Sequence, residues 1–131
     1  MKKVDLDQLW RDYKPMYPRY TAKLSNGETC GYTEFGSGPI TVVAIHGGWA
    51  CSEAMIPYMK VLGKTMRVIA PCLRGFGYSS YNKPMTGCDD LANDIVLLIK
   101  EHLKLKEFYL LGHSMGTTVS CYIAIELGEM C

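Results

Sequence analysis

The chain has 131 residues, a length that fits one domain and leaves no room for two. Its hydrophobic fraction of 48% and charged fraction of 21% exclude a disordered or collagen-like chain. Lys and Arg number 14 against 13 for Asp and Glu, and this net charge of +1 creates no field that attracts phosphates, so we expect no nucleic-acid partner.

The cysteines and the N-terminus indicate in which cellular compartment the protein is expected. The spacing of the six cysteines is irregular, without a C-x-x-C pair or a histidine at metal-ligand spacing, which predicts free thiols and no metal site. Two lysines open the chain without an apolar stretch after them, so no signal peptide is predicted. The longest aliphatic run, Ile95 to Ile99, is too short for a membrane span. We therefore expect a reduced, cytoplasmic protein.

The first third of the chain predicts an arm and a hairpin. Residues 1–19 are polar with two prolines and are predicted to form an N-terminal arm, with room for a short helix at its start. From Tyr20 to Glu34 apolar and polar residues alternate on both sides of Asn26-Gly27. Asn-Gly is a strong hairpin signal because both central positions of that turn need a positive φ.

Alternating strands and helices are predicted next. The β-branched run Ile40 to Ile45 is typical of a parallel strand buried on both faces, and Met66 to Ala70 predicts a second strand. A short helix is expected between Ser52 and Gly63, and Pro57 makes its start ambiguous, because a proline suits the first turn of a helix. Residues 71–85, rich in Gly, Tyr and Ser, are expected to form a loop.

The last third predicts two longer helices around one strand. Thr86 and Asp89 have capping-box spacing, and apolar residues then recur at helical spacing to Leu103. Residues 108–111 predict a third buried strand, and residues 115–127 a helix with Gly128 as its C-cap. The predicted fold class is therefore α/β, an antiparallel N-terminal hairpin followed by a mostly parallel sheet flanked by helices.

A G-x-S-x-G pentapeptide lies between the third strand and the last helix, at residues 112–116. A serine on a sharp strand-to-helix turn presents its hydroxyl next to a helix N-terminus, which favours negative charge. The tight turn requires glycine on both sides of Ser114. The backbone N–H of Met115 would then face a developing oxyanion.

His46-Gly47-Gly48-Trp49 is the second signal, at the end of the first predicted parallel strand. Oxyanion stabilisation needs a second N–H donor, and glycines let a backbone approach the serine closely. The carboxyl ends of neighbouring parallel strands lie at the same edge of a sheet, where sites in open α/β folds form.

These two motifs, with Pro71-Cys72-Leu73-Arg74-Gly75-Phe76-Gly77-Tyr78-Ser79-Ser80 between them, resemble the α/β-hydrolase fold family over about residues 20–131. Cys72 stands where the family usually has Asp. The resemblance implies Ser114 as nucleophile, the N–H groups of Met115 and Gly48 as the oxyanion hole, and no cofactor. Trp49 is a candidate for lining the substrate pocket, although a core or rim position is equally compatible. A serine at the elbow argues against relatives with an aspartate nucleophile, namely epoxide hydrolases and haloalkane dehalogenases.

Other titratable residues have simpler explanations. His46 could serve as a base, but the resemblance implies a structural hydrogen-bonding role. Asp89, Asp90 and Asp94 fit charge complementarity at a helix N-terminus better than a catalytic acid.

The chain continues for 17 residues after Ser114, and they contain no His and no Asp. In this family an acid and then a His follow the nucleophile. The chain therefore looks like the N-terminal portion of a hydrolase domain, residues 20–131, whose parent cleaves an ester, thioester or amide-like bond of a small substrate through an acyl-enzyme on Ser114. Alone it is expected to be inactive. The alternative is a non-catalytic binding protein or truncated pseudo-enzyme of the same fold. The third strand would have an unpaired edge, which predicts self-association.

Overall fold

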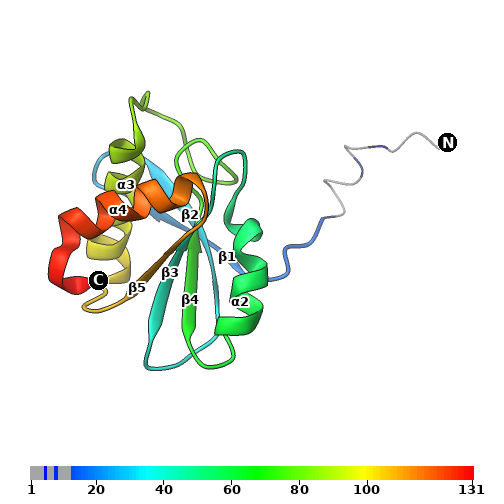
Figure 1. Ribbon diagram of the computed structural model, residues 1–131. Helices are drawn as coiled ribbons and strands as arrows, with labels where there is room; N and C mark the ends of the chain where they lie inside the picture. Colours follow the sequence, from blue (N-terminus) through cyan, green and yellow to red (C-terminus); the bar gives the residue numbers. More distant parts are fainter. Residues whose placement is uncertain (1–4, 6–7, 9–12) are drawn as a thin grey trace.

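The structure is a computed structural model and describes residues 5, 8 and 13–131. A five-stranded mixed sheet has the strand order β1-β2-β4-β3-β5 (Figure 1). The strands are β1 (Arg19–Lys23), β2 (Thr29–Phe35), β3 (Thr41–Ile45), β4 (Arg67–Pro71) and β5 (Tyr109–Gly112). β1 pairs with β2 and β2 with β4 in antiparallel fashion, whereas β3 is parallel to both β4 and β5. This is the predicted fold class, an antiparallel hairpin followed by a mostly parallel sheet flanked by helices.

Helices cover both faces of the sheet (Figure 1). One face carries the 3₁₀ turn η1 (Ser52–Met55) and α2 (Ile56–Leu62), and the other carries α3 (Cys88–Leu97) with its π-helical end η2 (Leu98–Leu103) and α4 (Met115–Leu127), which ends in η3 (Gly128–Met130). Pro57 occupies the first turn of α2, as predicted. No helix in the described part of the chain has the length and apolar character needed to cross a membrane.

The predicted hairpin is confirmed. Its turn differs in detail from the prediction: Gly27 adopts a φ of +90°, but Asn26 has no positive φ. The N–H of Leu24 donates to the carbonyl of Glu28 at 2.8 Å, so the loop has three residues rather than two. β1 begins at Arg19, one residue before the predicted start of the domain. Tyr17 of the predicted arm stacks on Phe35 of β2 at 4.3 Å between ring centroids. The short helix expected at the start of the arm falls outside the described residues, and the division at residue 20 stays a prediction.

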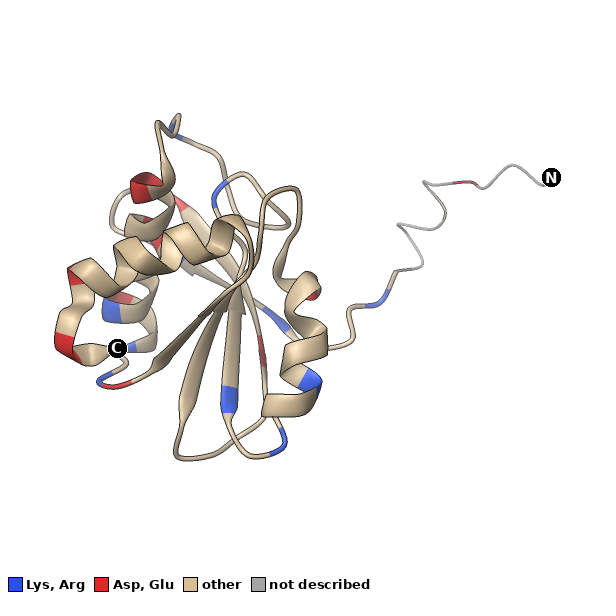
Figure 2. Ribbon diagram, viewed as in Figure 1, with Lys and Arg blue, Asp and Glu red and all other residues tan. Residues whose placement is uncertain are grey.

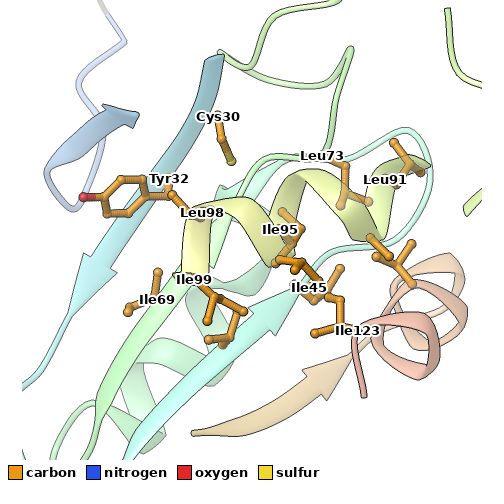
Figure 3. Packing of buried hydrophobic residues seen from close by; sticks show 14 of the residues in the cluster. Cys30, Tyr32, Ile45, Ile69, Leu73, Leu91, Ile95, Leu98, Ile99 and Ile123 are labelled. Atoms are coloured by element: carbon orange, nitrogen blue, oxygen red, sulfur yellow. The ribbon is translucent and has the colours of Figure 1, made fainter. Parts of the chain in front are cut away.

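The alternation of side chains along the strands divides the core into two layers. Val43, Ile45 and Ile69 face α3 and α4, where Ile95 and Ile123 lie against them (Figure 3). The intervening residues of β3 and β4 face the opposite layer, which contains the buried Met55 and Met59. β3 contributes to both layers because its side chains alternate between two faces that are both covered by helices. It is also uncharged, as Figure 2 shows.

The start of α3 differs from its prediction. The N–H and hydroxyl of Thr86 both donate to the carboxylate of Asp90, at 2.7 and 3.0 Å, so the acidic partner lies four residues on rather than three. Gly87 is the N-cap residue and makes no side-chain cap bond. An extended Gly87 moves Thr86 back by one position, which brings Asp90 rather than Asp89 within its reach.

The third parallel strand is less buried than predicted. β5 begins at Tyr109, whereas Phe108, which is almost fully buried, precedes it. Tyr109 is 59% exposed and the rest of the strand is half-buried. β5 lies at one edge of the sheet, with β3 as its only neighbour, and on the face that carries α2 only Leu111 of this strand packs against the core. The unpaired edge predicted for this strand is present, whereas the apolar run by itself had indicated a fully buried strand.

Candidate active site

Ser114 occupies a sharp turn between β5 and α4. Its φ of +53° and ψ of −124° are rare for a residue with a side chain. The N–H of His113 donates to the carbonyl of Ile45 at 3.0 Å, so pairing with β3 continues up to the residue before the serine. The carbonyl of Ser114 then accepts the N–H of Thr117 at 2.8 Å and begins the helix. The side chain of Ser114 is exposed.

Both flanking glycines are required by close backbone contacts. A Cβ on Gly112 would lie 2.6 Å from the Cα of Thr117, and a Cβ on Gly116 would lie 2.3 Å from the carbonyl oxygen of Ile45. The first turn of α4 therefore packs directly against the ends of β3 and β5. The hydroxyl of Thr117 donates to the carbonyl of Gly112 at 3.2 Å and closes the turn. No acidic side chain occupies the first turn of α4, so nothing there offsets the positive end of the helix dipole.

The loop after β3 lies beside this turn. A Cβ on Gly47 would be 3.1 Å from the Cβ of Ser114, and one on Gly48 would be 3.8 Å from the sulfur of Met115. The structure thus brings together Ser114, Met115 and Gly48, the three residues predicted for nucleophile and oxyanion hole. Their catalytic roles stay predictions.

Trp49 follows in the same loop and is fully exposed, with a φ of +57°. This excludes the core position that the sequence left open. The indole stands at the rim of the loop that approaches Ser114.

His46 is fully buried behind this loop and uses both ring nitrogens. Its Nε2 lies 3.0 Å from the N–H of Leu73 and accepts it, so the ring proton is on Nδ1, which donates to the carbonyl of Gly47 at 2.6 Å. Burial lowers the pKa of His46, although the bond to Gly47 opposes this shift. His46 is therefore a neutral structural hydrogen-bonder, as the resemblance implied, and not a free base.

Cys72 takes over part of the hydrogen bonding at the position where the family usually has Asp. Its buried sulfur accepts the N–H of Ser52 at 3.3 Å, and its carbonyl accepts the hydroxyl of Ser79 at 2.6 Å. A Cβ on Gly77 would lie 2.6 Å from this sulfur, so glycine there lets the loop fold onto Cys72. The six cysteines are free, two of them buried.

Sequence reasoning missed a buried ionic network that holds the same loop. The guanidinium of Arg74, 5% exposed, donates to both carboxylate oxygens of Asp94 at 2.6 and 2.8 Å, and Asn26 donates to Asp94 at 2.7 Å. Asp94 thus does not complement the helix dipole. The sequence did carry a signal for this role. Asp94 follows Leu91 by three residues and precedes Ile95, which puts its charge on the apolar face of the predicted helix.

Glu28 completes this network from the hairpin. It accepts hydrogen bonds from the hydroxyl of Ser80 and from the N–H groups of Asn82 and Lys83, and it lies 3.9 Å from Arg74. Burial raises the pKa of Glu28, but these hydrogen bonds outweigh it and hold the pKa below its usual value. The loop of residues 73–83 is therefore tied to both the hairpin and α3.

The remaining candidates lie away from Ser114 or carry no chemistry. Asp89 and Asp90 are in the first turn of α3, as predicted. His102 contacts the hydroxyl of Tyr32 at 3.3 Å, at the far end of the α3–η2 helix from the elbow. Among the described residues, no three His, Cys, Asp or Glu side chains gather as metal ligands.

Known proteins share this arrangement. The family model described as the alpha/beta hydrolase fold matches residues 40–129. The uncharacterized hydrolase YugF of Bacillus subtilis (strain 168) is 29% identical over 90 residues, 69% of this chain and 33% of that protein.

Solved structures agree with the sequence match. Epoxide hydrolase VrEH1 from Vigna radiata is similar with a TM-score of 0.75 and 26% identity, over 87% of this chain and 37% of that one. A haloalkane dehalogenase DbeA-M1 loop variant from Bradyrhizobium elkanii has a TM-score of 0.78 at 24% identity, over 86% of this chain and 37% of that one, which shows the fold alone. The chain spans well under half the length of each of these proteins. With the family model covering both the glycine loop and the serine turn, the chain belongs to the α/β-hydrolase fold family.

Proposed function

We propose that this chain is the nucleophile-bearing portion of a serine hydrolase that cleaves an ester, thioester or amide-like bond of a small substrate. The observation that carries the proposal is the conformation of Ser114, an exposed non-glycine residue held at a φ of +53° directly before α4. Strain of this kind costs on the order of 1–3 kcal/mol and persists where the surroundings impose it, often at functional sites.

The chemistry follows from the groups around the serine. Ser114 Oγ attacks the carbonyl carbon, its proton passes to a base, and the carbonyl oxygen becomes an oxyanion. The N–H groups of Met115 and Gly48 would donate to this oxyanion at the positive end of α4. Expulsion of the leaving alcohol, thiol or amine gives an acyl-enzyme, which water hydrolyses. No cofactor takes part in this scheme. We place the protein in the cytoplasm because its six cysteines are free thiols, which suits a reducing compartment.

The base and acid of this reaction are expected from outside these 131 residues. Both nitrogens of His46 are engaged, and no His or Asp follows Ser114 in the sequence. Trp49, exposed at the rim of the glycine loop, would contact the substrate beside the reacting carbonyl.

Labelling with a fluorophosphonate probe tests the nucleophile. In a longer protein that supplies the acid and histidine, we expect the label on Ser114, and Ser114→Ala should abolish it. Ser120→Ala is the matched control, because Ser120 lies on the same helix with its hydroxyl bonded to the carbonyl of Gly116. Label on another residue, or no label on the folded longer protein, would contradict the proposal and favour a binding protein of the same fold.

Hydrolysis of p-nitrophenyl acetate tests the chain by itself. Without a base, only the oxyanion donors contribute, and triad-deleted sites retain about 10³–10⁴-fold over water. We expect the 131-residue chain to remain within one or two orders of magnitude of that background. Ordinary enzyme rates would show that a group within the chain acts as the base.

We also propose that the isolated chain self-associates through β5. The N–H of His113 points toward β3, and the backbone groups of successive residues in a strand point to opposite sides. The N–H and C=O of Leu110, three residues earlier, therefore point away from β3 and are unpaired within the sheet. This edge is shorter than the sequence suggested, because the outward N–H of Phe108 already donates to the carbonyl of Met130 at 3.1 Å. A short, uncharged edge next to the exposed Tyr109 still offers a pairing site.

Size-exclusion chromatography with light scattering tests the self-association. We expect a mass above that of one chain, and Tyr109→Lys should restore the monomer because it puts a charge on the edge. Tyr122→Lys, on α4 and 45% exposed, is the control that should leave the association unchanged. A soluble wild-type monomer with a cooperative melt would overturn the proposal.

A further inference from the structure

We infer that the buried Arg74–Asp94 ion pair positions the peptide between Gly47 and Gly48, acting through Leu73 and His46, so that the N–H of Gly48 points toward Ser114. The inference rests on the proposed function for its catalytic meaning, but its geometry can be tested without it. Arg74 and Asp94 do not touch the serine, so they are positioning residues.

The last step of this connection is the most direct. In a trans peptide the C=O and the following N–H point in opposite directions, and the described chain has no cis peptide bonds. The Nδ1–H of His46 holds the carbonyl of Gly47 at 2.6 Å. It therefore also sets the direction of the Gly48 N–H, which belongs to the same peptide unit. Glycines on both sides leave that peptide free to rotate unless something holds it.

The imidazole can hold this carbonyl only in one tautomer. The N–H of Leu73 donates to Nε2 at 3.0 Å, which keeps that nitrogen unprotonated and leaves the proton on Nδ1. The ring also packs edge-on against Phe76 at 5.6 Å between centroids. If the Leu73 amide moved away, the other tautomer would become accessible, and its Nδ1 could not donate to Gly47.

The Leu73 amide is held from two sides: the carbonyl of Cys72, in the same peptide unit, accepts the hydroxyl of Ser79 at 2.6 Å, and Arg74 follows on the other side. Leu73 lies at the start of the irregular loop after β4, without a sheet partner of its own. The Arg74 guanidinium is fixed by two bonds to Asp94 on α3, and it donates to the carbonyl of Lys83 at 3.3 Å. A bidentate buried pair restricts both distance and orientation. The ion pair thus fixes the loop next to the amide that selects the tautomer.

Nuclear magnetic resonance of the full 131-residue chain tests the connection without substrate. In the wild type we expect the ring nitrogens of His46 to show the Nδ1–H tautomer, with slow hydrogen exchange at the Leu73 amide. Asp94→Asn keeps the size of the side chain but removes its charge. In this variant we expect a second tautomer of His46 and a shifted resonance of the Gly48 amide. Hydrogen exchange, relative to the wild type, should accelerate at the Leu73 amide at least tenfold more than at the amide of Val43 in the central strand.

Two further variants keep the test decisive. Arg74→Lys retains the positive charge but loses the bidentate geometry, and it should give the same His46 changes. It serves as the test if Asp94→Asn does not fold. Glu34→Gln breaks the Arg67–Glu34 pair on β2 and β4, with contacts of 2.6 and 3.2 Å, and should leave the His46 signals as in the wild type.

An unchanged His46 tautomer in folded Asp94→Asn or Arg74→Lys, with all core amides accelerated equally, would show that the pair is merely structural and would overturn the inference. These spectra do not depend on the nucleophile, so a failure of fluorophosphonate labelling would bear on the proposed function alone.

Discussion

Gly116 lies where the serine-bearing helix meets the central strand, and Gly116→Ala should be among the most destabilising methyl additions in this chain. The new Cβ would lie 2.3 Å from the carbonyl oxygen of Ile45, 2.5 Å from that of His46 and 2.8 Å from the carbonyl carbon of Ile45. All three are backbone atoms at the end of β3, so no side-chain rotation relieves the overlap.

The magnitude follows from the displacement required. Ordinary contact begins at 3.4 Å, so the first turn of α4 must move by about 1 Å in a tightly packed interior. Val119 and Ile123, both fully buried on the same helix, would lose contacts at the same time. Overpacking of this kind costs about 1–3 kcal/mol, and we expect the upper part of that range. For a domain of this size, the melting temperature should fall by about 10 °C.

Urea denaturation followed by circular dichroism measures this loss. Gly48→Ala is the matched control, because its Cβ would meet only the flexible Met115 sulfur, at 3.8 Å, and its backbone is not left-handed. We expect that variant to stay within about 0.5 kcal/mol of wild type. A Gly116→Ala protein equally close to wild type would refute the close packing of helix on strand.

Three further predictions concern strain, pH and exposure. Ser114→Gly should raise the free energy of unfolding by about 1 kcal/mol or more, because glycine relieves the strained φ, whereas Ser114→Ala should not; thermal melts compare the two. Stability should fall as the pH drops below about 6.5, because burial lowers the pKa of His46 in the folded state and the unfolded chain then binds the extra proton, at up to about 1.4 kcal/mol per pH unit. His46→Asn should flatten that slope, and a second loss should begin below about 4.5, where Glu28 becomes protonated more readily in the unfolded chain. Trp49→Ala should leave the urea midpoint unchanged, since the indole is fully exposed, and a large shift would show that it packs on the protein.

The fold was predictable where local chemistry and periodicity agree. The hairpin turn depends on Gly27, whose positive φ suits glycine, although Asn26 does not share it. The β-branched run at residues 40–45 suits a central strand whose two faces are both covered. The serine turn was also predictable, because the constraint on Gly112 and Gly116 is local to one strand, one turn and one helix.

Other features depend on contacts that no local pattern encodes. Whether residues 109–112 form an edge depends on how many strands lie beyond them, and their apolar character suits either position. The role of Asp94 depends on Arg74, 20 residues earlier, and on Asn26 in the hairpin. The exposure of Trp49 depends on its left-handed backbone, which turns the indole out of the loop.

The serine turn and the glycine loop constrain one another through the backbone. Gly116 can approach the carbonyls of Ile45 and His46 only because it lacks a side chain, and the carbonyl of Ile45 also accepts the N–H of His113. The end of β3 therefore holds the residues on both sides of Ser114, while His46, the first residue after β3, holds the carbonyl of Gly47. A displacement of the helix would thus move the serine and the loop together. For this reason the mutations that matter most for the proposed chemistry should be those at the backbone contacts, where stability and geometry change at once.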